Sequence, residues 1–407
     1  MGAMSRKKRL AVVTPFLDKG YGTERTVIEW LSNLPENFEI HVYSQRVTDL
    51  PASKFVLHRI PTLPGPHIFN FLWWVAANHA LRFWDRFARG MKHDLVYSPG
   101  INCFDADVIS VHIVFAEYLR QARPELRFSR NPVRSWPRLL HRNIYYRLII
   151  ALEKWIYSDA DTLLVLYAKK TAKDLERFYG RHDPLPVLYL GIDHGTYNPG
   201  TRERLRDEAR AELGIQDGRF VVLMVGNDLR KKGIHVLCQA MRELIRLPVD
   251  LIVAGREDPA PFQRMVDELG LRDRVRFLPA RKDVEFYYAA ANAYAGPSLE
   301  DTFALPPAEA MACGLPVIVS SQNGTCEIIT HETDGLILQD PADVTTLAAM
   351  IRKLYEDPAF CRRLGENAAA TAMQYTWERN GKDLGKLFEE ILVRKSAAHG
   401  PALEQKT

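Results

Sequence analysis

Three adjacent cations lie between a predicted strand and a predicted helix in the second half of the chain. Arg230, Lys231 and Lys232 follow the short apolar run Phe220–Val225 and precede a helical pattern. Cations at a helix N-terminus oppose the helix dipole and destabilise the helix unless an anion neutralises them. The pattern therefore indicates a phosphate or diphosphate site, and a solvated loop is the alternative.

Another cation, Arg281, has a similar setting. It follows the predicted strand Val275–Leu278 and precedes a helical stretch. We expect it to reach the same anion, whereas Lys282 and Asp283 beside it favour a surface loop as the alternative.

Glycines occupy the loop after the first predicted strand. Gly20 and Gly22 precede a predicted helix, so backbone N–H groups there could approach a phosphate. The dinucleotide-binding pattern Gly-x-Gly-x-x-Gly fails because Arg25 stands at the third glycine, and no Walker string occurs in the chain. NAD binding therefore loses its main support, and P-loop chemistry is excluded. The alternative is a turn that caps the helix.

Length and composition describe a folded protein of about two domains. The chain has 407 residues, 47% hydrophobic and 26% charged, with a net charge of +4 that gives no general argument for nucleic acid. Its five cysteines lie far apart without a Cys-x-x-Cys pair, which argues against zinc or a disulfide framework and favours a reducing cytoplasm. No apolar run reaches the ~18 residues that span a bilayer.

Short β-branched runs alternate with longer amphipathic stretches, which is typical of βαβ units and parallel sheets. Strands are predicted at Arg9–Phe16, Phe38–Tyr43, Phe55–Ile60, Leu95–Ser98, Val108–Ile113, Thr162–Leu166, Val187–Leu190, Phe220–Val225, Val249–Ala254, Val275–Leu278, Ala293–Gly296, Pro316–Val319 and Gly335–Leu338. A loop rich in Gly, Asn, Asp and Pro separates the two halves. We therefore expect an α/β protein of two Rossmann-like domains, residues 5–191 and 200–375, that face each other across a cleft.

The segment from Gly296 to Pro316 carries the densest pattern, GPSLEDTFALPPAEAMACGLP. It resembles the donor-site signature of family 4 glycosyltransferases, Pro-Ser-x-x-Glu-x-Phe-Gly-x-Pro-x-x-Glu-Ala-Met-Ala-x-Gly-x-Pro. The two carboxylates of that signature, eight positions apart, fall on Asp301 and Glu309, with Glu300 displaced by one residue. Asp301 replaces the usual glutamate, and Ala304 replaces a glycine.

The resemblance extends over most of the chain. Gly22 and Glu24 match the first glycine loop of the family, and the segment 190–193 is similar to its linker entry. Lys232 falls on the lysine of the family's Gly-Arg-x-x-x-x-Lys-Gly motif. Asn227 stands where that motif has arginine, so Lys231 or Arg281 would compensate.

The resemblance implies a GT-B fold and a retaining hexosyltransferase that uses a UDP- or GDP-linked sugar without a metal or other cofactor. It also implies a C-terminal helix, residues 376–395, that packs back on the first domain. The implied catalytic residues are His112, Lys232, Asp301 and Glu309. The implied donor-binding residues are Gly20, Gly22, Lys231, Lys232, Arg281, Val284, Asp301, Thr302, Phe303, Ala304, Leu305 and Glu309.

Within this implied site, Lys232 and a nearby cation neutralise the leaving diphosphate, and Glu309 holds the ribose hydroxyls. His112, at a predicted strand end, contacts the 6-hydroxyl of the sugar and is not a general base; a core histidine is the alternative. The reaction is front-face attack, in which the departing phosphate takes the acceptor's proton.

Two Asp-x-Asp strings occur in the first half of the chain, at residues 105–107 and 159–161. Such strings bind a metal in the other large glycosyltransferase fold, but each of these precedes a predicted strand. Because they do not follow a strand, we expect them to lie away from the cleft and to bind no metal.

The predicted first domain also carries a basic and aromatic segment. Residues 120–147 hold eight arginines against the single acid Glu125, and the stretch 69–74 is rich in Phe and Trp. We expect contact with an anionic membrane or an anionic acceptor, with a solvated basic loop as the alternative. The expected setting is the cytoplasm, peripheral at the inner face of the plasma membrane. The expected acceptor is a glycan, lipid-linked or other cell-envelope molecule, not nucleic acid.

Three alternatives stay open. A nucleotide-sugar epimerase or hydrolase would share the cationic loop but would need a proton-abstracting pair. A non-catalytic, two-domain sugar-binding protein would also close on a ligand. The departures at Asn227, Asp301 and Ala304 leave room for an inactive transferase.

Overall fold

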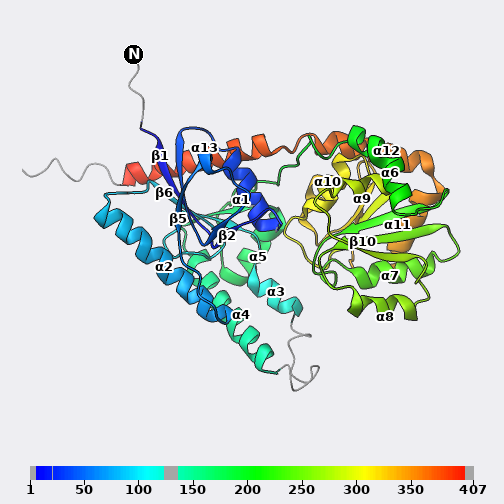
Figure 1. Ribbon diagram of the computed structural model, residues 1–407, viewed down its shortest axis with the longest axis horizontal. Helices are drawn as coiled ribbons and strands as arrows, with labels where there is room; N and C mark the ends of the chain where they lie inside the picture. Colours follow the sequence, from blue (N-terminus) through cyan, green and yellow to red (C-terminus); the bar gives the residue numbers. More distant parts are fainter. Residues whose placement is uncertain (1–5, 21, 123–135, 399–407) are drawn as a thin grey trace, which may run out of the picture. The chain divides into compact units, whose positions relative to one another are not determined.

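The computed structural model describes residues 6–20, 22–122 and 136–398. The chain divides into two compact units (Figure 1). Unit 1 runs to Tyr189 and resumes at Trp377, and unit 2 comprises Leu190–Thr376. Each unit is built around one six-stranded sheet in which every pairing is parallel.

The sheet of unit 1 has the strand order β5-β3-β1-β6-β7-β8. Its strands are β1 (Lys8–Val13), β3 (Phe38–Ser44), β5 (Val56–Arg59), β6 (Leu95–Pro99), β7 (Val108–Val111) and β8 (Leu163–Leu166), and β2 (Phe16–Leu17) pairs with β4 (Arg46–Val47) beside it. The helices are α1 (Gly22–Ser32), α2 (His67–Ala88), α3 (Phe115–Ala122), α4 (Trp136–Tyr157), α5 (Lys169–Tyr179) and α13 (Trp377–Ala398).

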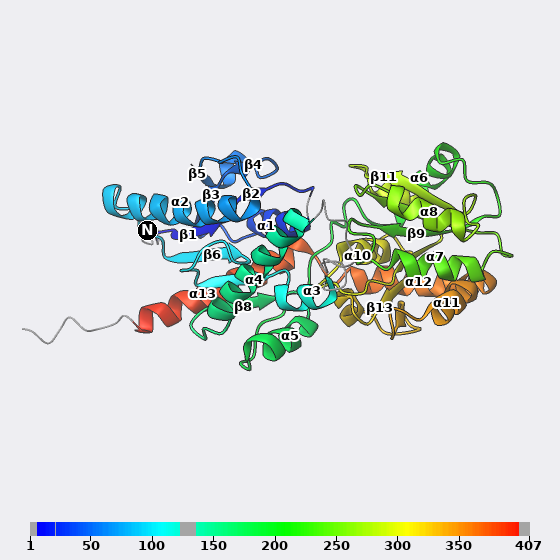
Figure 2. The ribbon, with the colours of Figure 1, turned by 90° about the horizontal axis from the view of Figure 1, so that it is seen from below.

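Helices cover both faces of this sheet, which explains why residues 10–13 of β1 and the whole of β8 are apolar. Ala11 and Val13 of β1 share a core with Trp74 of α2 and Ile149 of α4. On the other face, α1 and α13 pack together, and the ring of Phe388 lies 5.7 Å from that of Tyr97. The C-terminal helix α13 therefore belongs to unit 1 (Figure 2).

Glycines on α13 allow its close approach to unit 1. A Cβ at Gly381 would lie 2.6 Å from the carbonyl oxygen of Asn33, and one at Gly385 would lie 2.8 Å from Pro35. Larger residues at these two positions would push the helix off the unit.

Unit 2 has the strand order β11-β10-β9-β12-β13-β14. Its strands are β9 (Phe220–Val225), β10 (Val249–Gly255), β11 (Val275–Pro279), β12 (Ala293–Gly296), β13 (Val317–Ser320) and β14 (Leu336–Leu338). Its helices are α6 (Pro199–Glu212), α7 (Ile234–Glu243), α8 (Ala260–Glu268), α9 (Glu285–Ala290), α10 (Leu305–Ala312), α11 (Val344–Glu356) and α12 (Pro358–Ala372). The order reverses between β9 and β12, and ligands of such sheets bind at the carboxyl ends of the strands where the order reverses.

Most predicted strands are confirmed to within one or two residues, and two predictions were wrong in part. The run Arg9–Phe16 breaks at Val13, because Pro15 has no N–H for the sheet ladder. The run Val187–Leu190 forms a single bridge from Val187 to Leu166 and no strand. Pro184 and Pro186 precede this bridge, and a proline cannot donate to the ladder.

Candidate active site

The loops that follow β9 and β12 lie against each other at the carboxyl edge of the unit 2 sheet. The backbone N–H of Leu299 donates to the carbonyl of Lys231 over 2.8 Å. Gly233 has a φ of +83°, and a Cβ there would lie 2.1 Å from the carbonyl oxygen of Pro297. Only glycine allows this conformation and this approach together.

The joined loops pair two lysines with two carboxylates. The ammonium of Lys231 lies 2.7 Å from the carboxylate of Glu300, and Lys232 forms an ion pair with Asp301. All four side chains are at most 22% exposed. The sequence predicts a phosphate or diphosphate at these cations. In the structure, the loop after β12 places two carboxylates beside them.

Burial alone would lower the pKa of Lys231. The charges of Glu300 and Asp301 outweigh burial, so the pKa of Lys231 lies above its ordinary value. Lys231 therefore stays cationic at neutral pH. When a ligand approaches this loop, the lysines can exchange their protein carboxylate partners for oxygen atoms of the ligand.

Backbone hydrogen bonds fix the segment that carries Asp301. The N–H of Asp301 donates to Gln322 and its carbonyl accepts from Gly324, each over 3.0 Å. The hydroxyl of Thr325 donates to the carbonyl of Ala304 over 2.7 Å. Phe303, Ala304 and Leu305 are buried, whereas Thr302 is partly exposed in this segment.

Glu309 on α10 is buried, and a tyrosine holds its carboxylate. The hydroxyl of Tyr288, on α9, donates to Oε2 of Glu309 over 2.9 Å and lies 3.1 Å from the carbonyl oxygen of Pro306. Burial raises the pKa of Glu285, with smaller contributions from the charges of Asp283, Glu309 and Asp193. The carboxylates of Glu285 and Glu309 can accept hydrogen bonds from the hydroxyl groups of a ligand. Sequence reasoning missed Tyr288, which carries no motif.

Arg281 lies apart from the paired lysines. It follows β11, and β10 separates β11 from β9. Its guanidinium pairs with Glu212 over 2.7 Å and with Asp283 over 2.8 Å, and it stacks 3.9 Å from the ring centre of Phe286. Val284, the N-cap residue of α9, follows this cluster directly. Donor contact by Arg281 and Val284 stays a prediction.

In unit 1, His112 follows β7 directly and lines a cavity of about 420 Å³. Its Nε2 lies 2.8 Å from the hydroxyl of Tyr167 and 3.1 Å from Oγ of Ser110. Burial lowers the pKa of His112 to about 3. The ring is therefore neutral near pH 7 and a weak base, which fits hydrogen bonding to a hydroxyl better than proton abstraction.

Gly20 and Gly22 belong to the loop between β2 and α1. The N–H of Gly20 donates to Oδ1 of Asp18 over 2.9 Å, and α1 begins at Gly22. A Cβ at Gly22 would meet no described atom within 4 Å. The packing of the described residues does not require glycine there, so the space beside it is available to a ligand.

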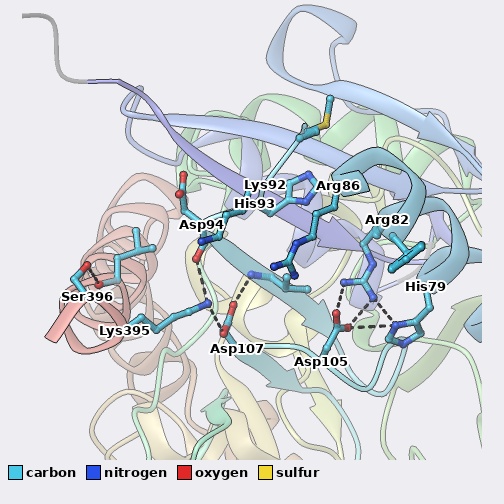
Figure 3. Close-up of a pocket in the computed structure, with 14 residues that line it drawn as sticks. His79, Arg82, Arg86, Lys92, His93, Asp94, Asp105, Asp107, Lys395 and Ser396 are labelled. Atoms are coloured by element: carbon cyan, nitrogen blue, oxygen red, sulfur yellow. Dashed lines mark hydrogen bonds and ion pairs between the residues drawn. The ribbon is translucent and has the colours of Figure 1, made fainter. Parts of the chain in front are cut away.

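A second cavity of unit 1, about 650 Å³, lies at the amino edge of its sheet and contains one of the Asp-x-Asp strings (Figure 3). Arg82 holds Asp105 with two hydrogen bonds of 2.7 and 2.8 Å, and Lys395 pairs with Asp107 over 2.7 Å. These ion pairs attach α2 and α13 to the sheet. We assign this string a structural role.

Comparison with known proteins finds a family match for part of unit 2. Residues 206–371 match the family of glycosyl transferases group 1. The match lies entirely within unit 2. It contains Lys231, Lys232, Asp301 and Glu309, so the paired lysines and the buried glutamate lie within the matched region.

A curated relative of this chain is D-inositol 3-phosphate glycosyltransferase of Corynebacterium urealyticum, 32% identical over 252 residues. The alignment covers 59% of this chain and 59% of that relative. A similar protein of Corynebacterium jeikeium is 31% identical over 251 residues, again 59% of each chain.

Solved structures confirm the GT-B fold over 93% to 94% of the chain. WaaG, a glycosyltransferase involved in lipopolysaccharide biosynthesis, has a TM-score of 0.75 at 21% identity and covers 93% of this chain and 99% of its own. HepE of Anabaena, in complex with UDP and glucose, has a TM-score of 0.69 at 20% identity, with 94% and 99% covered.

Proposed function

We propose that the protein is a retaining glycosyltransferase that moves a hexose from a nucleotide-diphosphate sugar to an acceptor. The observation that carries the proposal is the pairing of Lys231 and Lys232 with Glu300 and Asp301, beside Glu309, within the segment that matches the group 1 family. Such a site exchanges its carboxylate partners for the oxygens of a diphosphate.

The lysines act on the leaving group. When the glycosidic C–O bond breaks, negative charge grows on the diphosphate, and cations fixed beside it stabilise the transition state more than the ground state. In our proposal Lys232 contacts this diphosphate, and Lys231 stays cationic beside it. These two ammonium groups supply the charge for which other enzymes use a metal ion, so no cofactor is required.

Glu309 and Asp301 orient the donor. Tyr288 holds Oε2 of the Glu309 carboxylate. In our proposal this carboxylate binds the donor, because one ionised carboxylate can accept hydrogen bonds from two ribose hydroxyls. Asp301 leaves Lys232 as the diphosphate enters and accepts from the sugar hydroxyls. The segment from Thr302 to Leu305 completes the part of the donor site that unit 2 supplies.

His112 contacts the transferred sugar. As a neutral ring whose Nε2 lies near Tyr167 and Ser110, it offers a hydrogen-bonding edge and takes no proton. The acceptor's proton goes to the departing phosphate in a front-face reaction. The donor is a UDP- or GDP-sugar; HepE, a structural neighbour, is known with UDP and glucose.

The acceptor is a glycan, a lipid-linked sugar or another cell-envelope molecule, reached from the cytoplasmic side of the membrane. Apolar side chains on α2 and α4 support a membrane contact: Phe83, Phe87 and Trp155 are 68%, 80% and 62% exposed. Conversely, α2 buries Asn78 and Asp85 completely. A helix that lies in a membrane interface likewise turns apolar side chains outward to the lipid.

Arginines accompany these apolar side chains. Arg138, Arg142 and Arg147 are exposed on α4 and would attract anionic lipids. Of the basic segment 120–147, residues 123–135 lie outside the described residues. None of the described helices is long and apolar enough to cross a membrane.

Turnover of candidate donors tests the proposal. UDP- and GDP-hexoses are incubated with the protein and a lipid extract, and products are analysed by ¹H NMR. A glycosylated acceptor with the anomeric configuration of the donor supports the proposal. An altered nucleotide sugar, formed without any acceptor, would instead show the epimerase alternative, and free sugar alone would show a hydrolase.

A further inference from the structure

A cavity of about 670 Å³ lies at the amino edge of the unit 2 sheet, opposite the loops of the candidate active site. Phe220 at the start of β9, Asn292 before β12 and Pro316 before β13 line it. The donor loops follow these same strands at their carboxyl ends. The cavity is therefore separate from the candidate active site and takes no part in the proposed transfer.

Five arginines line this cavity: Arg202, Arg206, Arg210, Arg219 and Arg362. We call it the arginine pocket. The carboxylates among its lining residues are Asp217 and Glu366. Arg219 pairs with Asp250, and within the described parts of the chain none of the other four arginines forms an ion pair. The pocket therefore has an excess of positive charge.

Three of these arginines form a row along α6, spaced four residues apart so that they share one face of the helix. They donate to backbone carbonyls at the end of α9: Arg202 to Ala291 over 3.1 Å, Arg206 to Ala289 over 3.0 Å and Arg210 to Ala290 over 3.1 Å.

Carbonyl groups carry only partial negative charge, and no carboxylate of the described residues forms an ion pair with the row. Burial, then the charges of Arg202 and Arg210, lowers the pKa of Arg206 to about 10. Nε of Arg202 is buried and has no hydrogen-bond partner. The row thus satisfies the end of α9 and still leaves donors and positive charge for another group.

We propose that the arginine pocket binds a phosphorylated small molecule and that this ligand regulates the donor site. The pocket supplies planar, charged donors that match phosphate oxygens, and Pro199, Leu354 and Tyr355 add apolar surface for the rest of the ligand. Its volume suits a molecule the size of a sugar phosphate or a nucleotide.

Two helices connect the arginine pocket with the candidate active site. α9 begins beside Val284, holds Glu309 through Tyr288, and ends at the carbonyls that bind the arginine row. α10 carries Glu309, and Gly314, just beyond its end, lines the pocket. A phosphate that attracts the arginines changes their bonds to α9, and so the support of Glu309.

Calorimetric titration with inorganic pyrophosphate tests the binding. Arg362 is exposed and forms no bond in the described structure, so Arg362→Glu reverses a charge of the pocket without removing a structural contact. Arg363→Glu, its exposed neighbour outside the pocket, is the matched control. Lys232→Met removes a cation of the candidate active site, where pyrophosphate also binds under the proposed function.

We expect pyrophosphate to bind at two classes of site, the arginine pocket and the candidate active site, in the wild type and in Arg363→Glu. Lys232→Met should keep the arginine-pocket class, and adding Arg362→Glu to Lys232→Met should weaken that class at least tenfold. Equal pyrophosphate binding in Lys232→Met with and without Arg362→Glu would overturn the proposal, whatever becomes of the donor site.

Hydrogen exchange measures the connection to α9. In Lys232→Met, pyrophosphate should change amide protection of residues 285–291, and the added Arg362→Glu should abolish the change. Binding at the arginine pocket without altered exchange in these residues would disprove the regulatory part of the proposal.

Discussion

The hydroxyl of Tyr288 donates a 2.9 Å hydrogen bond to Oε2 of Glu309, and both side chains are buried. This bond joins α9 to α10 and fixes one oxygen of the carboxylate that, in our proposal, holds the ribose. If a buried carboxylate loses such a donor, its desolvation is no longer offset by the hydrogen bond, and the folded state is destabilised. The bond therefore affects both the stability of unit 2 and its affinity for a donor.

Tyr288→Phe tests this bond. We expect a loss of about 1–3 kcal/mol in the free energy of unfolding, together with weaker nucleotide binding, because Glu309 loses its donor. Tyr287→Phe is the control, since its hydroxyl donates to the carbonyl of Pro279 over 2.8 Å and not to Glu309. Urea unfolding and calorimetry measure the two effects. Equal nucleotide affinities in both variants would contradict the assigned role of Tyr288.

Gly233→Ala should disrupt the contact between the loops after β9 and β12. The alanine would adopt a φ of +83° and place its Cβ 2.1 Å from the carbonyl oxygen of Pro297. Gly218→Ala imposes a similar φ of +76° with no described atom within 4 Å, so it isolates the conformational cost of about 1 kcal/mol. We expect a clearly larger drop in the urea midpoint for Gly233→Ala than for Gly218→Ala. Equal drops would show that the loop with Pro297 moves aside at little cost and that the close contact is not required.

Glu153 makes the stability of unit 1 depend on pH. Burial raises the pKa of this carboxyl to about 8 from an ordinary value of 4.5. Between these two values only the folded state holds the proton, so the free energy of unfolding falls by up to about 1.4 kcal/mol per pH unit as the pH rises. This contribution is complete below pH 4.5 and lost above pH 8.

Glu153→Gln should remove that dependence. Relative to the wild type, its urea midpoint should rise steadily from pH 5.5 to pH 8, whereas Glu36→Gln, an exposed site in unit 1, should follow the wild type. A constant difference between Glu153→Gln and the wild type over this range would show that Glu153 is ionised in the folded protein.

The exposed rings of α2 should anchor the protein on anionic lipid. Phe83 and Phe87 stack with their centres 6.0 Å apart. We expect Phe83→Ser with Phe87→Ser to reduce co-sedimentation with phosphatidylglycerol vesicles at least fivefold, because exposed apolar area is lost. Met373→Ser, which removes a residue of unit 2 that is 59% exposed, is the control. Undiminished binding by the double variant would exclude α2 from the membrane contact.

Sequence reasoning located the strands well because the sheets are covered on both faces. A run such as Phe220–Val225 is apolar at every position, and its end defines where a ligand loop begins. Lys232 and Glu309 were predicted as site residues through a resemblance in two separate motifs, and both follow strands at the carboxyl edge of the unit 2 sheet.

Contacts between distant residues could not be predicted in the same way. Lys231 and Glu300 are 69 positions apart, as are Arg281 and Glu212, and only the strand order determines which loops meet. The row of arginines on α6 is visible in the sequence as a four-residue spacing, but its carbonyl partners 80 to 89 residues away are not.

The most direct test of the proposed donor site is a thermal-shift and calorimetric panel of UDP, GDP, ADP, TDP and CMP. The wild type is compared with Lys232→Met and with Lys282→Met, an exposed lysine in the loop after β11. Ligand binding to the folded state raises the unfolding temperature. We predict that one nucleoside diphosphate stabilises the wild type and Lys282→Met and binds Lys232→Met at least tenfold more weakly. Absence of any shift in the wild type, or equal affinity in Lys232→Met, would contradict a nucleotide-diphosphate site at Lys232.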